Sequence, residues 1–422
     1  MYIIVILFAV FLIGIPICYS LGIVSMLGLF LADMDLIVVA QRIYTGVDSI
    51  TLISIPMFVL SGNLMVKGGM SKRLVDFSDK LIGHFPSGLA MVTILAGVFF
   101  AMITGSGIAS AAAIGGIMIP IMVKQGYDPE FCGPLVATAG SIGPIIPPSI
   151  TLLLYGVVAE ISISKLFIGG FLPGILMALS LMVYSYIVGK KRNYIGREKR
   201  ATIQEVIKSA KYGILALIMP IIIIGGIMSG IFTATESGAI AVFYSLVVGC
   251  FIYRELKFKD IFDVFVDSAI GTAMTIIIVA FASLFSWLIT LNQIPQTLTL
   301  FLSENIHSKF IMLVIINIVL LIAGTFLDAI SNVVLFAPLF IPLAIEYGID
   351  LVHFGLIMAV NLSIGMCTPP VGVCMFVGNS IAGITMKQSL KDLIPMCVML
   401  IIVLILITYF PSITMILPNL FG

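Results

Sequence analysis

Two glycine- and proline-rich segments of this 422-residue chain have similar sequences and lie 222 residues apart. Ser141-Ile-Gly-Pro-Ile-Ile-Pro-Pro148 is repeated as Ser363-Ile-Gly-Met-Cys-Thr-Pro-Pro370. Because a proline pair inside an apolar span interrupts the helix, it frees backbone carbonyl oxygens that, with nearby hydroxyl groups, suit a hard cation such as Na⁺. The helix that restarts after the break exposes amides that favour an anion. The two segments therefore predict binding sites for a cation and an anionic solute.

The same offset relates residues well beyond these two segments. Matching pairs are Ala101 and Ala323, Pro120 and Pro342, Gly126 and Gly348, Asp128 and Asp350, Gly133 and Gly355, and Pro173 and Pro395. A duplicated apolar segment that glycine and proline interrupt is typical of the binding region of secondary transporters with internal repeats.

The composition indicates that the chain lies in a lipid membrane. It is 61% hydrophobic and 10% charged, whereas soluble domains have roughly 25% charged residues. The net charge of +1 gives no reason to expect nucleic acid, and the six cysteines lack metal-site spacing. The apolar segment from Tyr2 to about Leu31 is too long for a cleaved signal peptide and predicts a first membrane span.

Basic residues predict the orientation, because cytoplasmic loops are enriched in lysine and arginine. The connector 190–211 is strongly basic and is expected in the cytoplasm. The other basic connectors fall on the cytoplasmic side only if blocks 87–123 and 310–345 each enter and leave the membrane on the same side. Each has a small, polar middle, Thr104–Ser110 and Gly324–Asn332, which predicts a re-entrant hairpin with its tip in mid-membrane. The two hairpins then open to opposite sides, with the N-terminus in the cytoplasm and the C-terminus outside.

The predicted fold is therefore an all-α polytopic membrane protein built from inverted repeats. Each repeat has one re-entrant helical hairpin and one broken transmembrane helix. Asp328 is the one carboxylate expected at mid-membrane, where acids are costly and usually functional. Its possible roles are Na⁺ ligation, substrate contact, proton transfer, or a structural cap on helix amides. For Glu236, the Thr233-x-x-Glu236 spacing favours a helix capping box.

Other functional classes fit the sequence less well. The chain has neither an HExxH nor a GxSxG motif, no second mid-membrane acid, and no phosphate-binding loop. We therefore expect neither an enzyme nor an ATP-driven pump. A passive channel remains an alternative, although inverted repeats with two half-hairpins suit alternating access better.

Over nearly its whole length, the chain resembles the large membrane (M) subunit of tripartite ATP-independent periplasmic (TRAP) transporters. The matching motifs are Ser54-Ile-Pro-Met-Phe-Val-Leu-Ser-Gly62, Gly105-Ser-Gly-Ile-Ala-Ser110, Ile146-Pro-Pro-Ser149 and Gly230-Ile-Phe-Thr-Ala-Thr-Glu236. In the last motif Ala234 stands where the family usually has proline.

The resemblance implies an elevator-type fold like that of the ion transporter superfamily, in a bacterial inner membrane and driven by a Na⁺ gradient. It implies two partners: a small four-helix membrane (Q) subunit, expected as a separate polypeptide, and a soluble periplasmic substrate-binding (P) protein. The substrate would be an organic acid, with sialic acid expected first. A C4-dicarboxylate subunit and a single-component Na⁺/dicarboxylate carrier are the alternatives.

The resemblance also implies site residues and a division of the chain. Na⁺ would bind in at least two sites, one at Ser106, Gly143 and Pro147, the other at Gly324, Thr325, Asp328, Gly365 and Thr368. Substrate would lie near Ser106, Ser110, Ser149, Asp328 and Asn332. A transport domain (87–158 and 310–382) would slide across a scaffold (1–86, 159–309 and 383–422).

Overall fold

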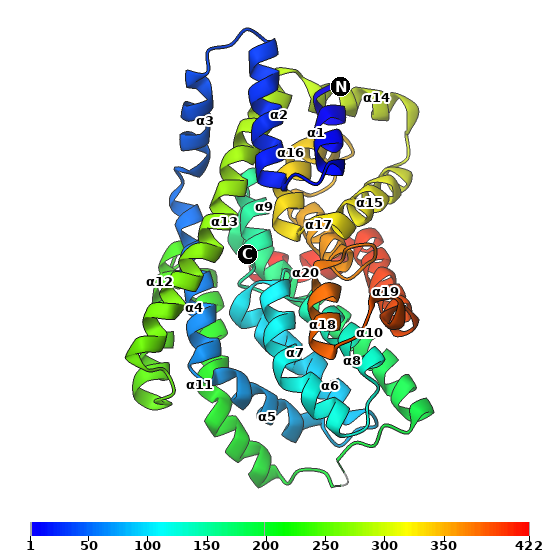
Figure 1. The fold of residues 1–422 in the computed structure, drawn as a ribbon. Coiled ribbons are helices and arrows are strands. Elements are labelled where there is room, and N and C mark those ends of the chain that lie inside the picture. Colours follow the sequence, from blue (N-terminus) through cyan, green and yellow to red (C-terminus); the bar gives the residue numbers. More distant parts are fainter. Residues whose placement is uncertain (1, 198, 422) are drawn as a thin grey trace.

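The computed structural model describes residues 2–197 and 199–421, which form helices joined by short connections (Figure 1). Within these residues, nine helices are long and apolar enough to span a membrane. The prediction of an all-α polytopic membrane protein is confirmed. The helices are α1 (Tyr2–Leu12), α2 (Ile17–Leu31), α3 (Ile37–Val47), η1 (Ile50–Ile53), α4 (Ser54–Lys67), α5 (Met70–Ile82), α6 (Gly88–Thr104), α7 (Gly107–Lys124), α8 (Pro129–Gly140), α9 (Ile150–Val158), α10 (Ile163–Arg192), α11 (Ile203–Met228), α12 (Ala234–Val247), η2 (Val248–Ile252), α13 (Phe258–Leu291), α14 (Ile294–Asn305), α15 (Lys309–Phe326), α16 (Ala329–Glu346), α17 (Leu351–Gly365), α18 (Val373–Ala382), α19 (Met386–Tyr409) and α20 (Pro411–Phe421).

Both predicted hairpins are present. Helices α6 and α7 pack side by side and are joined at Gly105–Ser106, where Gly105 has a left-handed φ of 61°. Helices α15 and α16 are joined at Leu327–Asp328. Figure 1 shows the first hairpin in the half of the molecule that holds α5, and the second hairpin in the other half. This arrangement agrees with inverted repeats.

Both predicted helix breaks are also present. Helix α8 stops at Gly140 and α9 starts at Ile150, while α17 stops at Gly365 and α18 starts at Val373. Each break contains two adjacent prolines joined by a cis peptide bond, Pro147-Pro148 and Pro369-Pro370. Proline lacks the amide hydrogen that a continuous helix needs, so the helix ends before the pair and restarts after it.

The two repeats interlock around these breaks. In each repeat the helix before the break packs on its own hairpin: α8 on α6 and α7, and α17 on α15 and α16. The helix after the break packs on the hairpin of the other repeat, so that α9 contacts α16 and α18 contacts α7. The hairpins and broken helices therefore form one packed core.

The remaining helices divide by their contacts. Helix α13 packs on α2, α3 and α4, while α12 contacts α4 and α11. Helices α10 and α19, in contrast, pack on the core, α10 against α6 and α17 and α19 against α8 and α17. By their contacts, α10 and α19 thus belong with the core rather than with the other helices.

The prediction of one membrane span from Tyr2 to about Leu31 is wrong. The segment forms two helices, α1 and α2, that pack together across a turn at Gly14–Pro16. The turn forms because Gly14 takes a left-handed φ of 91° and Pro16 cannot donate to a continuing helix. Since the chain reverses there, Figure 1 shows the N-terminus at the end opposite α5 and the basic connector. If that connector is cytoplasmic, the N-terminus lies outside, contrary to expectation.

The C-terminal end also differs from the expectation. Helix α19 ends at Tyr409, and α20 begins at Pro411 and packs back onto α10 and α17. Figure 1 places the C-terminus about midway along the molecule rather than at its outer end.

Candidate functional site

The tip of the first hairpin packs directly on the first helix break. A methyl group added at Gly143 would lie 2.6 Å from the Ser106 carbonyl oxygen. One added at Gly105 would lie 2.2 Å from the carbonyl oxygen of Pro148. Only glycine permits such close approach of two backbones. The structure therefore brings Ser106 and Gly143 together, and it places Pro147, which is buried, in the same break.

The second hairpin also packs on the break of its own repeat, but the residue that meets Gly365 is Gly324 and not Asp328, the equivalent of Ser106. A methyl group at Gly365 would lie 2.5 Å from the Gly324 Cα. The amide of Gly372 donates to the Thr325 carbonyl oxygen at 3.1 Å. Thr368 lies in this break, but its hydroxyl donates to the Ile364 carbonyl at 2.8 Å. In both repeats, backbone groups of the tip and the break lie against each other.

Ser106 and Asp328 each cap the second helix of a hairpin. The Ser106 hydroxyl accepts from the Ala109 amide at 3.5 Å. The Asp328 carboxylate accepts from the amides of Ile330 at 3.1 Å and Ser331 at 3.4 Å, and from the Ser331 hydroxyl. The capping role that the sequence left open for Asp328 is thus present. The half-buried carboxylate both caps the helix and lines a cavity.

Three predicted substrate residues hold the tips and a break in shape. The Ser110 hydroxyl lies 2.7 Å from that of Thr104, across the first tip. The Asn332 amide donates to the carbonyls of Leu327 and Asp328, both at 3.0 Å, across the second tip. The Ser149 hydroxyl donates to the Pro144 carbonyl and accepts from the Leu152 amide at 3.1 Å. Their role in substrate binding remains a prediction. Their short-range partners follow the usual pattern for Ser and Asn near helix starts, which could have indicated these structural roles.

The second tip opens into an apolar cavity that sequence reasoning missed. Its volume is about 780 Å³. Asp328, Phe326 and Leu327 line it from the hairpin, and the α1–α2 turn at Gly14–Pro16 lines it from the other side. Since residues 2–31 were expected to form one span, no pattern in the sequence indicated that this turn approaches Asp328.

The donor set at the tips is oxygen-rich. Within the described residues, no three His, Cys, Asp or Glu side chains come close enough to hold a metal ion together. Carbonyl and hydroxyl oxygens with a single carboxylate suit a hard cation of low charge better than a transition metal. Na⁺ fits the chemistry of these residues.

Glu236 has the structural role that its spacing favours. Its carboxylate accepts from the Thr233 amide at 2.8 Å, and its own amide donates to the Thr233 hydroxyl at 3.2 Å. The capping-box interpretation is confirmed.

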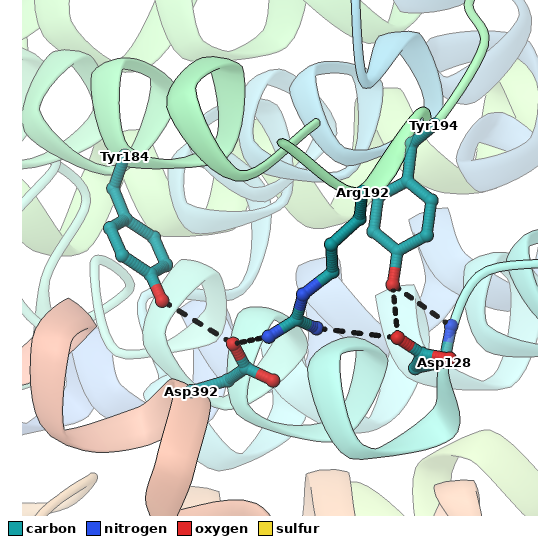
Figure 2. Close-up of polar contacts among 5 residues, drawn as sticks. All are labelled: Asp128, Tyr184, Arg192, Tyr194 and Asp392. Carbon is teal, nitrogen blue, oxygen red and sulfur yellow. Dashed lines mark hydrogen bonds and ion pairs between the residues drawn. The ribbon is translucent and has the colours of Figure 1, made fainter. Parts of the chain in front are cut away.

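A second polar cluster, absent from the sequence predictions, lies at the end of α10 (Figure 2). Arg192 contacts Asp392 at 2.5 Å and Asp128 at 3.4 Å. The Tyr194 hydroxyl donates to Asp128 at 2.6 Å, and the Tyr184 hydroxyl donates to Asp392 at 3.4 Å. Burial, aided by the Asp128 carboxylate, raises the pKa of Tyr194 to about 12, so it remains a donor at neutral pH. Residues bonded to each other in this cluster lie up to 208 positions apart along the chain, beyond the reach of local patterns.

Inverted hairpins that meet helix breaks in an all-helical, apolar fold define a multi-pass membrane transporter. The chain belongs to the family described as "Tripartite ATP-independent periplasmic transporter, DctM component", which matches residues 4–413. It is accordingly a transport permease and not an enzyme, and the resemblance seen in the sequence is confirmed.

Named relatives cover nearly the whole chain. The isethionate TRAP transporter permease protein DctMQ of Oleidesulfovibrio alaskensis is 40% identical over 97% of this chain, which spans 65% of that protein. The C4-dicarboxylate TRAP transporter large permease protein DctM of Pseudomonas aeruginosa is 39% identical over 96% of this chain and 94% of its own length. The sialic acid TRAP transporter large permease protein SiaM of Vibrio cholerae is 37% identical, covering 97% and 96%.

Among solved structures, the YdaH transporter of Alcanivorax borkumensis superposes with a TM-score of 0.65 at 13% identity. The superposition covers 89% of this chain and 87% of that one. It supports the fold class alone.

Proposed function

We propose that this chain couples a Na⁺ gradient to the uptake of a small organic anion across a bacterial inner membrane. The observation that carries the proposal is the repeated contact of a hairpin tip with a helix break, Ser106 on Gly143 and Gly324 on Gly365. Each contact gathers backbone and hydroxyl oxygens where a membrane helix is interrupted. Such interruptions are tolerated at membrane depth where they are buried in protein or line a wet cavity.

In this proposal each tip–break contact holds one Na⁺. Cation binding would draw the tip and the break together and fix the exposed helix start beside them. Helix starts at Ser106 and Asp328 would then present amide dipoles to the anionic group of the solute. Asp328 would contribute the one carboxylate, and its negative charge would favour the cation.

Transport would proceed by an elevator movement of the packed core. The core is one interlocked unit, because each broken helix contacts both hairpins. Helices α4 and α11–α13 pack mainly on each other and on α2, α3 and α5, as a separate scaffold would. Movement of the core past this scaffold would carry both proposed Na⁺ sites and the solute together.

The substrate class that we propose is a small organic anion. The names of the relatives include isethionate, C4-dicarboxylate and sialic acid permeases at 40, 39 and 37% identity. Isethionate carries a sulfonate and the other two carry carboxylates, so an anionic group is what they share. Sialic acid, expected from the sequence, remains one candidate within this class.

The partners that we propose are a small membrane subunit and a soluble periplasmic substrate-binding protein. The family description carries the words tripartite and periplasmic, which support them. The test is uptake into proteoliposomes that hold this chain and the small subunit, with an inward Na⁺ gradient and the binding protein outside. Isethionate, a C4-dicarboxylate and sialic acid would each be offered as labelled solute.

We expect saturable uptake of one of these solutes that needs Na⁺, the small subunit and the binding protein. Uptake without the binding protein would favour the single-component carrier. Non-saturating flux that ignores Na⁺ would favour a channel.

A further inference from the structure

The cluster around Arg192 joins three helices outside the proposed transport site (Figure 2). Arg192 is the last residue of α10, Asp392 lies on α19, and Asp128 directly precedes α8. The guanidinium bridges the two carboxylates. Because Asp392 is only 2% exposed, Arg192 neutralises a buried charge. The cluster therefore fixes the last turn of α10 and the second turn of α19 to the start of α8.

The second repeat lacks this arrangement. Asp350 stands at the position equivalent to Asp128 and caps α17, accepting from the amides of Val352 at 2.8 Å and His353 at 3.1 Å. Asp128 makes no such side-chain cap on α8 and instead accepts from Tyr194 and Arg192. The first repeat thus uses this carboxylate to join helices rather than to cap one.

Directly beyond Arg192, two connections of the chain run side by side. The Ser87 amide donates to the Tyr194 carbonyl at 3.0 Å, and the Arg197 amide donates to the Gly83 carbonyl at 2.8 Å. These bonds pair the α5–α6 connection with the start of the α10–α11 connection. On the far side, the Arg197 side chain contacts Asp79 of α5 at 2.9 Å.

A cavity next to the paired connections leaves room for movement. It has a volume of about 290 Å³ and lies between α5 and the first hairpin. Asp76 and Asp79 line it from α5, and Met118 and Ile121 line it from α7. A change in the angle between α5 and the hairpin would alter the width of this gap.

We propose that Arg192 is a positioning residue for transport and that it makes α10 and α19 part of the moving core. The paired connections 83–87 and 193–197 are then the hinge between that core and the helices α5 and α11. This inference rests on the proposed elevator movement. It moves the boundary of the moving body in the first half from residue 158 to the connector after Arg192.

Two distances measured with spin labels test the inference in the complete transporter, after replacement of the native cysteines. Labels at Asp76 and Gln125 report the distance across the hinge. Labels at Lys191 and Lys391 report the distance between α10 and α19 within the moving core. All four side chains are exposed. We expect Na⁺ and substrate to shift the 76–125 distance and to leave the 191–391 distance unchanged. A 191–391 distance that shifts as much as the 76–125 distance would overturn the inference.

Variants of the clamp, by which we mean the contacts of Arg192 with Asp128 and Asp392, supply the second arm of the test. We expect Arg192→Gln to broaden the 191–391 distance and to slow uptake roughly tenfold, since it leaves a buried carboxylate unpaired. Arg192→Lys should recover part of the rate, because lysine keeps the charge but lacks the planar fork that bridges two carboxylates. The matched control Lys190→Gln removes a neighbouring exposed charge and should change neither readout.

The double variant Arg192→Gln/Asp392→Asn removes the buried charge together with its partner. It therefore distinguishes a role of the clamp in transport from misfolding caused by an unpaired carboxylate. If it assembles and transports at the wild-type rate with an unchanged 191–391 distance, the clamp has no role in transport and the inference is wrong. A wild-type protein without Na⁺-driven uptake would instead reject the proposed function. The two failures are therefore distinguishable.

Discussion

Ser106 and Asp328 stand 222 residues apart and occupy the same position in the two hairpins, each as the N-cap of the second hairpin helix. Ser106 caps with a neutral hydroxyl and Asp328 with a carboxylate. The repeats thus share a backbone design but differ in charge at the tip. On the proposed function, the second tip should hold its cation more tightly than the first.

Asp328→Asn tests this difference in charge. Asparagine caps helices about as well as aspartate, so the tip should keep its shape while losing its negative charge. We expect the Na⁺ concentration for half-maximal uptake to rise by about tenfold or more, equivalent to roughly 1.4 kcal/mol. The measurement is initial uptake rate against Na⁺ concentration.

Asp350→Asn is the matched control, because Asp350 caps the start of α17 in the way that Asp328 caps the start of α16. Asp350 lies at the end of α17 away from Gly365 and the tip–break contact. It should leave the Na⁺ dependence unchanged. An unchanged Na⁺ dependence in Asp328→Asn would remove Asp328 from the cation site.

Glycine at the tip–break contacts should resist substitution. In Gly365→Ala the new methyl group would meet the Gly324 backbone, which cannot move aside as a side chain could. We expect a loss of about 1–3 kcal/mol in stability and a weakened response of the melting temperature to Na⁺. Gly143→Ala should behave alike, because its methyl group would meet Ser106 and Gly107.

Gly116→Ala on α7 is the control for these two variants, since no atom lies within 4 Å of its added methyl group. It should be neutral or stabilise the helix by up to about 1 kcal/mol. Equal effects of all three substitutions on the response to Na⁺ would contradict the role of the contacts.

Asn332 should be essential for the shape of the second tip. Its amide donates to the Leu327 and Asp328 carbonyls, and Asn332→Asp would replace that donor by a carboxylate facing two carbonyl oxygens. We expect this variant to lower the melting temperature more than Asn332→Ala, which costs about 1–3 kcal/mol because the Leu327 carbonyl loses this donor. If both variants melt like the wild type and lose only substrate affinity, Asn332 is a substrate contact and not a structural one.

The Tyr194 contact predicts the behaviour of the protein at alkaline pH. The pKa of Tyr194 is raised from 10.0 to about 12, chiefly by burial. A raised pKa means that the folded state favours the protonated phenol, so this stabilisation is complete below about pH 10 and is lost as pH rises through about 12. We therefore expect the melting temperature of the wild type to fall over this pH interval, and we expect Tyr194→Phe to lack the part of the fall that Tyr194 causes. A wild-type decline over the same interval that Tyr194→Phe leaves intact would contradict the assignment.

The sequence predicted the features that repeat or that follow from local chemistry. The helix breaks were found because their Ser, Gly and Pro residues recur at a fixed offset. The hairpin tips were found because two apolar blocks have small, polar middles and because the basic connectors fall on one side only if each block returns to the side it entered. The Glu236 cap followed from a spacing of three residues. In contrast, Arg192 and Asp392 come from helices 200 residues apart, and no local pattern pairs them.

The α1–α2 turn was missed for a different reason. Gly14 and Pro16 lie in an otherwise apolar segment that is long enough for one span, and hydropathy does not distinguish one tilted helix from two short ones. That single error placed the N-terminus at the same end of the molecule as the basic connector and hid the cavity beside Asp328.

The measurement that tests the central claim most directly is the initial rate of uptake in proteoliposomes as a function of Na⁺ concentration, with K⁺ replacing Na⁺. The complete transporter, its binding protein and its transported solute would be present throughout. If both tip–break contacts bind Na⁺, the rate should rise sigmoidally with Na⁺, and Gly365→Ala should make the curve less steep. Uptake that continues unchanged when K⁺ replaces all Na⁺ would contradict the account.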